Sequence, residues 1–277
     1  MALVKFPGGA TPELKPDEDD FHHDSDHESR ETGGKMSFLD HLDELRKRIV
    51  WSVVFIFAGF LIAFAFIQKL FEFIMLPLQE MLPVGQTLVY TNPSEAFILY
   101  IKIAAIGGLI LASPAVMSQV WLFIAPGLYT NEKKLAIPFV VLSSTFFIVG
   151  AAFSHYVVFP LAWQFFVSFT TDYLTFMPRV EPAFSMYLRL IIAFGLVFQM
   201  PTVVLFLAKM GILTARFMLK NFKYAVLIIF IASAILTPDA SPVTQLAMAG
   251  PMLFLYLVSV GLAWLFGKKR YLEEEEE

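Results

Sequence analysis

The amino-acid sequence predicts an all-α integral membrane protein that crosses the bilayer six times, with both ends in the cytoplasm. Hydrophobic residues make up 57% of the chain and charged residues 16%, whereas soluble domains are roughly 25% charged. The apolar residues come in long blocks, several of them near the roughly 20 residues that a helix needs to span a bilayer. Basic residues lie beside every second loop, which is the pattern of cytoplasmic loops.

Six apolar segments can be placed along the chain. Five have the length of a membrane span: residues 49–67, 97–124, 135–160, 186–207 and 245–266. The other segment, residues 224–236, covers only about 20 Å at roughly 1.5 Å per residue. We therefore expect this fifth helix to thin the bilayer locally or to lean on its neighbours.

The distribution of Lys and Arg sets the expected orientation. The flanks and loops assigned to the cytoplasm contain Arg46, Lys47, Arg48, Lys133, Lys134, Arg216, Lys220, Lys223, Lys268, Lys269 and Arg270. The alternate loops contain only Lys69 and Arg179. In one of these outer loops, "LFEFIMLPLQEMLP" has the pattern of a short amphipathic helix on the membrane surface.

Three regions differ in charge. Residues 1–35 carry nine acids and four bases and are predicted to be a disordered extension. Residues 36–272 form the six-helix membrane domain, and Glu273–Glu277 form an acidic tail. The chain contains no cysteine, which excludes a disulfide, a thiolate zinc site and a cysteine nucleophile.

Two acidic residues precede the bases of the first helix. In "FLDHLDELRKRIV", Asp43 lies four residues before Lys47 and Glu44 four before Arg48, so each acid can pair with a base on its own helix. A second carboxylate, Glu132, follows a capping residue at the next cytoplasmic corner, where it can stabilise a helix N-terminus. Alternatively, two carboxylates at one membrane surface could bind a peptide with two basic residues.

Other polar residues leave similar alternatives open. Gln199 lies inside the fourth segment, where it either hydrogen-bonds a neighbouring helix or has a function, and Pro201 is expected to kink that helix. Lys102 is a candidate partner for Glu95. The histidines of "FHHDSDHESR" have no fixed ligand spacing, so we expect no metal site, and no catalytic motif is present.

Several sequence motifs carry a resemblance to a known family. They are "SFLDHLDELRKRI", "PLQEMLPVGQTLVYTNPSEAF", "SPAVMSQVWLFIAPGLYTNEKK", "FGLVFQMPTVVLFLAKMGI" and "LTPDASPVTQLAMAGPM". Over about residues 36–266 the chain closely resembles the TatC family, the receptor subunits of the twin-arginine protein translocase.

The resemblance implies a fold and a function. Its fold is a curved, glove-like bundle of six helices with short fifth and sixth helices. TatC-like proteins bind signal peptides of the S/T-R-R-x-F-L-K type on folded cargo, and the proton-motive force drives export across the cytoplasmic membrane. The implied partners are TatA- and TatB-like single-span proteins, membrane lipids and further copies of the receptor, with no cofactor. The alternative function is an ion-coupled transporter of small molecules, which would require an intramembrane ionisable residue and two related halves.

The resemblance also implies site residues. The family's signal-binding carboxylates match Glu44 and Glu132, and Arg46 matches the base that orients the first of them. The neighbouring positions of the same site match Phe123, Leu128 and Tyr129. Contacts with the groove or with partner helices are implied for Pro77, Gln199 and Asp239. Many relatives have glutamate where this chain has Gln199, and Asp239 matches only across a gap.

Overall fold

The structure is a computed structural model that describes residues 38–80, 82, 88–124, 136–171, 173, 176–237 and 242–267. The chain divides into two compact units, Met1–Leu42 and Asp43–Glu277. Of the first unit the structure describes only residues 38–42, which form the start of helix α1. The second unit is mostly helical in its described part, and an isolated β-bridge joins Val89 to Arg179.

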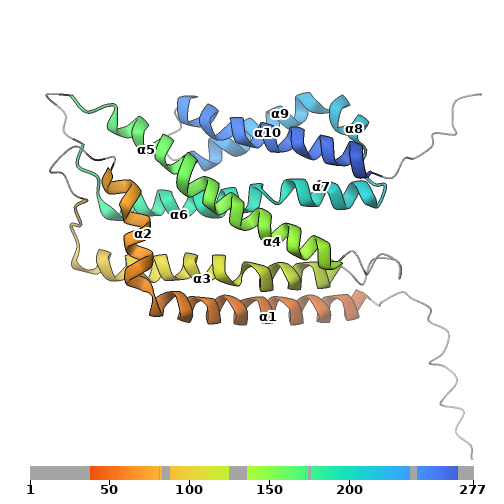
Figure 1. Cartoon of the computed structure of the whole chain (residues 1–277), viewed down its shortest axis with the longest axis horizontal. Coiled ribbons are helices and arrows are strands. Elements are labelled where there is room, and N and C mark those ends of the chain that lie inside the picture. The colour runs from red at the N-terminus through yellow and green to blue at the C-terminus, as the bar shows by residue number, and fades with distance from the viewer. Residues whose placement is uncertain are drawn as a thin grey trace, which may run out of the picture. The chain divides into compact units, whose positions relative to one another are not determined.

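Within the described residues, five helical segments are long and apolar enough to cross a membrane (Figure 1). They are α1 (Phe38–Ala65), α3 (Pro93–Ile124), α4 with its continuation through a π-helix into α5 (Ala136–Phe153, Ser154–Val158, Phe159–Val167), α6 with α7 (Val180–Val197, Met200–Lys209) and α10 (Pro242–Phe266). The protein is therefore a multi-pass membrane protein. The short fifth segment is confirmed as α9, Phe222–Leu236.

The helices extend beyond the predicted apolar segments. Helix α1 begins at Phe38 rather than near residue 49, so the charged stretch of Asp43 to Arg48 is helical. Helix α10 has 25 residues, so the expectation that the sixth helix is short is wrong. Its first residue is Pro242, and a proline is compatible with the first turn, where no intrahelical N–H bond is needed.

Two shorter helices complete the described part. Helix α2, Ile67–Glu80, contains residues 70–80 of the predicted amphipathic stretch, and these are thereby confirmed as helical. Helix α8, Ala215–Lys220, precedes α9 and is capped by the side chain of Thr214, which accepts a hydrogen bond from the backbone N–H of Phe217.

The fourth span is interrupted where the sequence predicts a kink. Helix α6 ends at Val197 and α7 begins at Met200, directly before Pro201. A proline removes a backbone donor and displaces the carbonyl of the preceding turn, so the helix is broken at residues 198 and 199.

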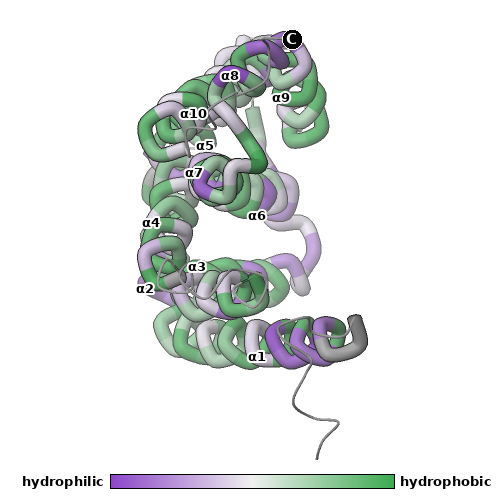
Figure 2. The backbone as a smooth tube through the Cα atoms, turned by 90° about the vertical axis from the view of Figure 1, so that its right-hand side faces the viewer, coloured by the Kyte–Doolittle hydropathy of each residue, from purple (hydrophilic) through white to green (hydrophobic). Residues whose placement is uncertain are grey.

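The helices pack in succession within this unit. Helix α3 packs on α4, α4 on α6, and α10 on both α7 and α9, as the tube in Figure 2 also shows. Of the most apolar 18-residue stretch of α1, only 11% is buried inside the protein. The corresponding share for α6 with α7 is 56%. Helix α1 therefore turns most of its apolar surface toward lipid, as the exposed Phe57, Leu61 and Ile62 illustrate.

Glycines allow α1 to approach α3 closely. A Cβ atom added to Gly59 would collide with the carbonyl oxygen of Gly108, and one added to Gly108 would collide with the backbone of Phe60. Lipid tails are as apolar as leucine, so helices in a membrane associate through such close van der Waals contact rather than through apolar burial.

We predict that Gly108→Ala separates α1 from α3 and destabilises the protein by about 1–3 kcal/mol, since the added methyl group has no space. Thermal unfolding of the detergent-solubilised protein measures the effect. Gly250→Ala is the matched control, because a Cβ atom there meets nothing within 4 Å. Equal unfolding midpoints for both variants would contradict this packing.

Candidate functional site

Glu44 forms a half-buried ion pair on α1. Arg48 donates to Oε1 of Glu44 from both Nη2 and Nε, at 2.7 and 3.2 Å. The side chain of Glu44 is 17% exposed and that of Arg48 is 23% exposed. The predicted pairing of these two residues along the helix is confirmed. Both contacts reach the same oxygen, and in the described part of the chain Oε2 accepts no hydrogen bond.

Gln119 extends this pair to the next helix. The amide Oε1 of Gln119, near the end of α3, accepts a hydrogen bond of 3.4 Å from Nη1 of Arg48. Gln119 is buried, so Arg48 joins α1 to α3 at this end of the bundle, which we call the Glu44 end. In the sequence, a glutamine within an apolar helix indicates that a polar contact exists. It does not indicate which residue is the partner.

Two expected contacts of this stretch are corrected. Arg46, expected to orient Glu44, is exposed, and Arg48 holds the carboxylate instead. Residues two apart lie on nearly opposite sides of a helix, whereas residues four apart are neighbours. Asp43 and Lys47 form no ion pair, although both belong to the described residues.

The other predicted signal-binding residues are only partly described. Phe123 lies in the last turn of α3, four residues after Gln119 and therefore on the same side of the helix, and it is half-buried. Leu128, Tyr129 and Glu132 lie outside the described residues, so their roles remain predictions.

Gln199 points into the helix bundle. At the α6–α7 break its Nε2 donates to the backbone carbonyls of Ser143, at 3.0 Å, and Gly195, at 3.4 Å. The hydroxyl of Ser143 in turn accepts a hydrogen bond of 2.9 Å from Nε1 of Trp121. Gln199 therefore hydrogen-bonds a neighbouring helix, the first of the two alternatives for this residue. Of the other implied contact positions, Pro77 falls within α2 and Asp239 lies outside the described residues.

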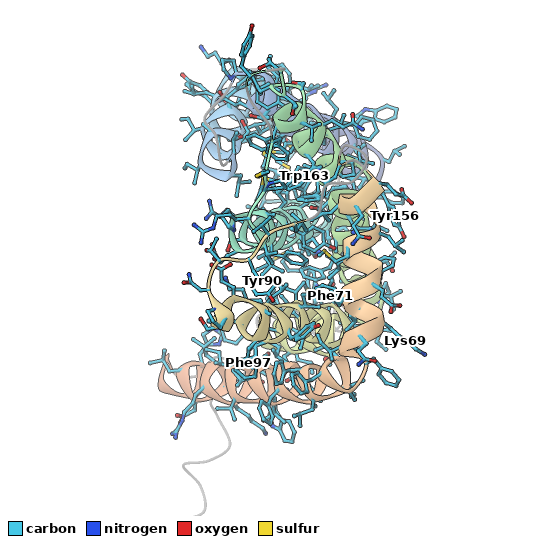
Figure 3. The ribbon with its side chains drawn as sticks, turned by 90° about the vertical axis from the view of Figure 1, so that its left-hand side faces the viewer. Lys69, Phe71, Tyr90, Phe97, Tyr156 and Trp163 are labelled. Atoms are coloured by element: carbon cyan, nitrogen blue, oxygen red, sulfur yellow. The ribbon has the colours of Figure 1, made fainter. Side chains whose placement is uncertain are left out.

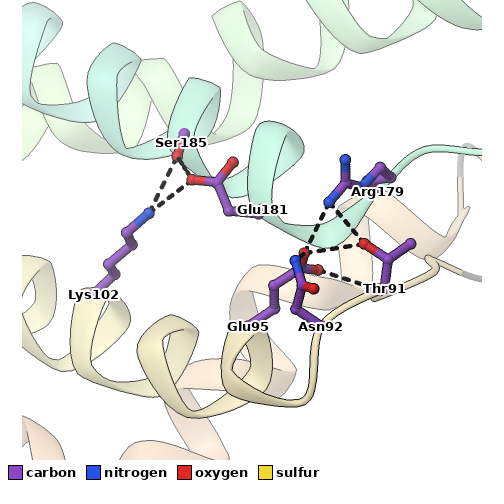
Figure 4. Close-up of polar contacts among 7 residues, drawn as sticks. All are labelled: Thr91, Asn92, Glu95, Lys102, Arg179, Glu181 and Ser185. Carbon is purple, nitrogen blue, oxygen red and sulfur yellow. Dashed lines mark hydrogen bonds and ion pairs between the residues drawn. The ribbon is translucent and has the colours of Figure 1, made fainter.

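Two ion pairs lie at the opposite end of α3, which we call the Glu95 end (Figure 4). Oε1 of Glu95 accepts a hydrogen bond of 2.9 Å from Nη2 of Arg179, and Thr91 and Asn92 also donate to the same carboxylate. Lys102 donates to Oε1 of Glu181 at 3.0 Å. The expected pairing of Lys102 with Glu95 is therefore wrong, because each finds a closer partner near the start of α6.

The segments before α3 and α6 also bind each other through their backbones. The N–H of Val89 donates to the carbonyl of Pro178, and the N–H of Val180 donates to the carbonyl of Val89, at 3.1 and 3.0 Å. Figure 3 shows Tyr90, beside this bridge, on the same side of α3 as Phe71 of α2. These backbone bonds and the Glu95–Arg179 pair join two segments that are far apart in the sequence.

Comparison with known proteins places the chain among protein translocases. Residues 40–251 match the family described as Sec-independent protein translocase protein (TatC). A Sec-independent protein translocase protein TatC of Desulforapulum autotrophicum is 41% identical, over 87% of this chain and 89% of that protein. The corresponding protein of Koribacter versatilis is 39% identical, over 90% and 92%.

Solved structures agree with the fold. A crystal structure of the twin-arginine translocase receptor TatC has a TM-score of 0.71 and 38% identity, and covers 80% of this chain and 97% of its own. A second, of the same receptor in the detergent DDM, has a TM-score of 0.72 and 37% identity, with 80% and 99% covered.

We predict that Arg179→Ala lowers the unfolding midpoint, since it leaves the Glu95 carboxylate without its cation. Thermal unfolding in detergent measures the loss. Arg216→Ala removes an equally charged, exposed side chain of α8 and is expected to leave the unfolding midpoint unchanged. The same midpoint in both variants would show that the Glu95–Arg179 pair contributes nothing.

Proposed function

This chain belongs to the TatC family of Sec-independent protein translocases, and we propose from that premise that its Glu44 end binds the twin-arginine signal peptide of folded cargo. It is a receptor component of the twin-arginine translocase and not an enzyme. The observation that carries the proposal is the half-buried Glu44 carboxylate, held by Arg48 through one oxygen only.

The geometry of Glu44 suits a guanidinium ligand. Arg48 fixes Oε1, which leaves Oε2 to accept a hydrogen bond from an arginine of the signal peptide. Arg48 is itself held by Gln119, so the carboxylate is positioned before the ligand arrives. Since a positioned acceptor loses less conformational entropy on binding, this arrangement favours affinity.

Glu132 supplies the second carboxylate in this proposal. It follows α3, whose last turn lies at the Glu44 end. Together the two carboxylates match the two positive charges of the signal, and Phe123 contributes an apolar ring to the same site. Leu128 and Tyr129 complete the proposed site.

The Glu44 end faces the cytoplasm in this proposal, and both termini lie on that side of the inner membrane. The support is the run of bases at the start of α1 and after α10, together with the few bases in the alternate loops. Folded cargo is exported toward the Glu95 end, with the proton-motive force as the energy source.

TatA- and TatB-like single-span proteins are the proposed partners. The short helix α9 supports their place, since its 15 residues cover only about 22 Å and leave the bilayer thin beside α10. Pro77 and Asp239 are proposed contacts of the groove or of partner helices. No observation favours the alternative of an ion-coupled transporter.

We predict that Glu44→Ala lowers the binding of a twin-arginine signal peptide at least tenfold, because a charge-assisted hydrogen bond contributes about 1.5–3 kcal/mol. Photo-crosslinking of a labelled peptide to the membrane-embedded protein measures the loss, and Glu132→Ala should act in the same way. Asp43→Ala, which removes the neighbouring exposed acid, is the control. Undiminished crosslinking to the Glu44 variant would exclude Glu44 from the site.

We also predict that a signal peptide with two lysines in place of its arginines binds more weakly to the unsubstituted protein. Both peptides have the same charge, but lysine lacks the planar pair of donors that fits a carboxylate. Competition between the two peptides gives the ratio of affinities. A ratio of one would mean that the site responds to charge alone.

A further inference from the structure

Helix α6 carries a polar stripe into the membrane-spanning part of the protein, where it faces α3. Glu181, Ser185 and Arg189 are spaced by four residues and therefore lie on one side of the helix. Lys102 of α3 donates to both Glu181 and Ser185, at 3.0 and 3.3 Å, which places that side of α6 against α3 (Figure 4). We call Lys102, Glu181, Ser185 and Arg189 the cationic stripe.

The stripe carries one uncompensated positive charge. Lys102 is neutralised by Glu181. Arg189 is exposed, and none of the residues one turn away, Ser185, Met186, Ile192 and Ala193, is an acid. Among the described residues Arg189 forms no ion pair. A guanidinium without an anion is costly in a membrane, so an anion is expected from outside the protein.

Arg189 lies near the outer end of its apolar segment. An arginine at a helix end can extend its side chain to the membrane surface. Arg189 lies three residues after the start of the apolar segment 186–207, so its guanidinium can reach the level of the lipid phosphates. Lys102 lies five residues after the start of the apolar segment 97–124.

The exposed residues of α6 beyond Arg189 are apolar. Ile192 and Leu196 continue the same side of the helix toward its middle and are 37% and 60% exposed. A cationic group at the outer part of a span, followed by exposed apolar side chains, matches a phospholipid, whose phosphate is followed by its acyl chains. A free phosphate ion would need only the cations.

We propose that the cationic stripe binds the headgroup phosphate of an anionic phospholipid from the leaflet at the Glu95 end. Arg189 and Lys102 donate to the phosphate oxygens, Glu181 holds the Lys102 ammonium in place, and an acyl chain covers Ile192 and Leu196. This inference does not depend on how the signal peptide binds.

Native mass spectrometry of the full-length protein with added phosphatidylglycerol tests the proposal. Arg189→Gln should lower the affinity for the retained lipid about fivefold, the effect of removing one cation at a membrane surface. Arg189→Lys should restore most of the binding, because it keeps the charge. The matched control is Lys209→Gln, which removes a base from the last turn of α7, at the other end of the same span.

Three results would overturn the proposal. The first is that Arg189→Gln retains phosphatidylglycerol as well as the unsubstituted protein does. The second is that the unsubstituted protein retains zwitterionic phosphatidylcholine as well as phosphatidylglycerol. The third is that millimolar inorganic phosphate displaces the lipid. The last would assign the stripe to a small anion instead. An unfolding midpoint of Arg189→Gln equal to that of the unsubstituted protein establishes that lost binding is not lost folding.

Discussion

Hydrocarbon provides no hydrogen-bonding partners, so a polar group within the spans is stabilised where the protein supplies one. Helix α4 supplies such partners. The backbone carbonyl of Ser143 accepts the amide of Gln199, and its hydroxyl accepts the indole N–H of Trp121. One residue thereby connects α3, α4 and the α6–α7 break. The interruption before Pro201 is stable because Gln199 forms these hydrogen bonds there.

The position of Glu44 depends on how α1 is held. Helix α1 is mostly exposed to lipid, and apolar burial contributes little to its attachment. Its contacts with α3 include the close approach of Gly59 to Gly108 and the hydrogen bond from Arg48 to Gln119. A change at the glycines therefore displaces the helix that carries the proposed arginine receptor.

The two ends of α3 use the same chemistry for different purposes. At the Glu95 end the carboxylate of Glu95 accepts hydrogen bonds from Arg179, Thr91 and Asn92. At the Glu44 end the carboxylate of Glu44 is held through one oxygen. A saturated carboxylate joins two parts of the protein, whereas a partly satisfied one can bind a ligand. The guanidinium of Arg189 is likewise without an ion-pair partner among the described residues, and the proposed lipid phosphate would supply one.

The sequence by itself determined the class, the spans and the helical pairing of Glu44 with Arg48. These properties follow from local features: the length of apolar blocks, the short segment at α9, the proline after Gln199 and the spacing of four residues within one helix. The resemblance to the translocase family also rests on contiguous motifs.

Only the tertiary structure decided which residues meet across helices. Proximity along the chain suggested Glu95 for Lys102, and the family resemblance suggested Arg46 as the residue that orients Glu44. Lys102 instead pairs with Glu181, and Gln119 joins the Glu44–Arg48 pair from another helix. Lys102 and Glu181 are 79 residues apart, and no periodicity within a helix relates them. The physical reason is that a polar group pairs with whatever the packing brings within about 3 Å, and packing is a property of the whole bundle.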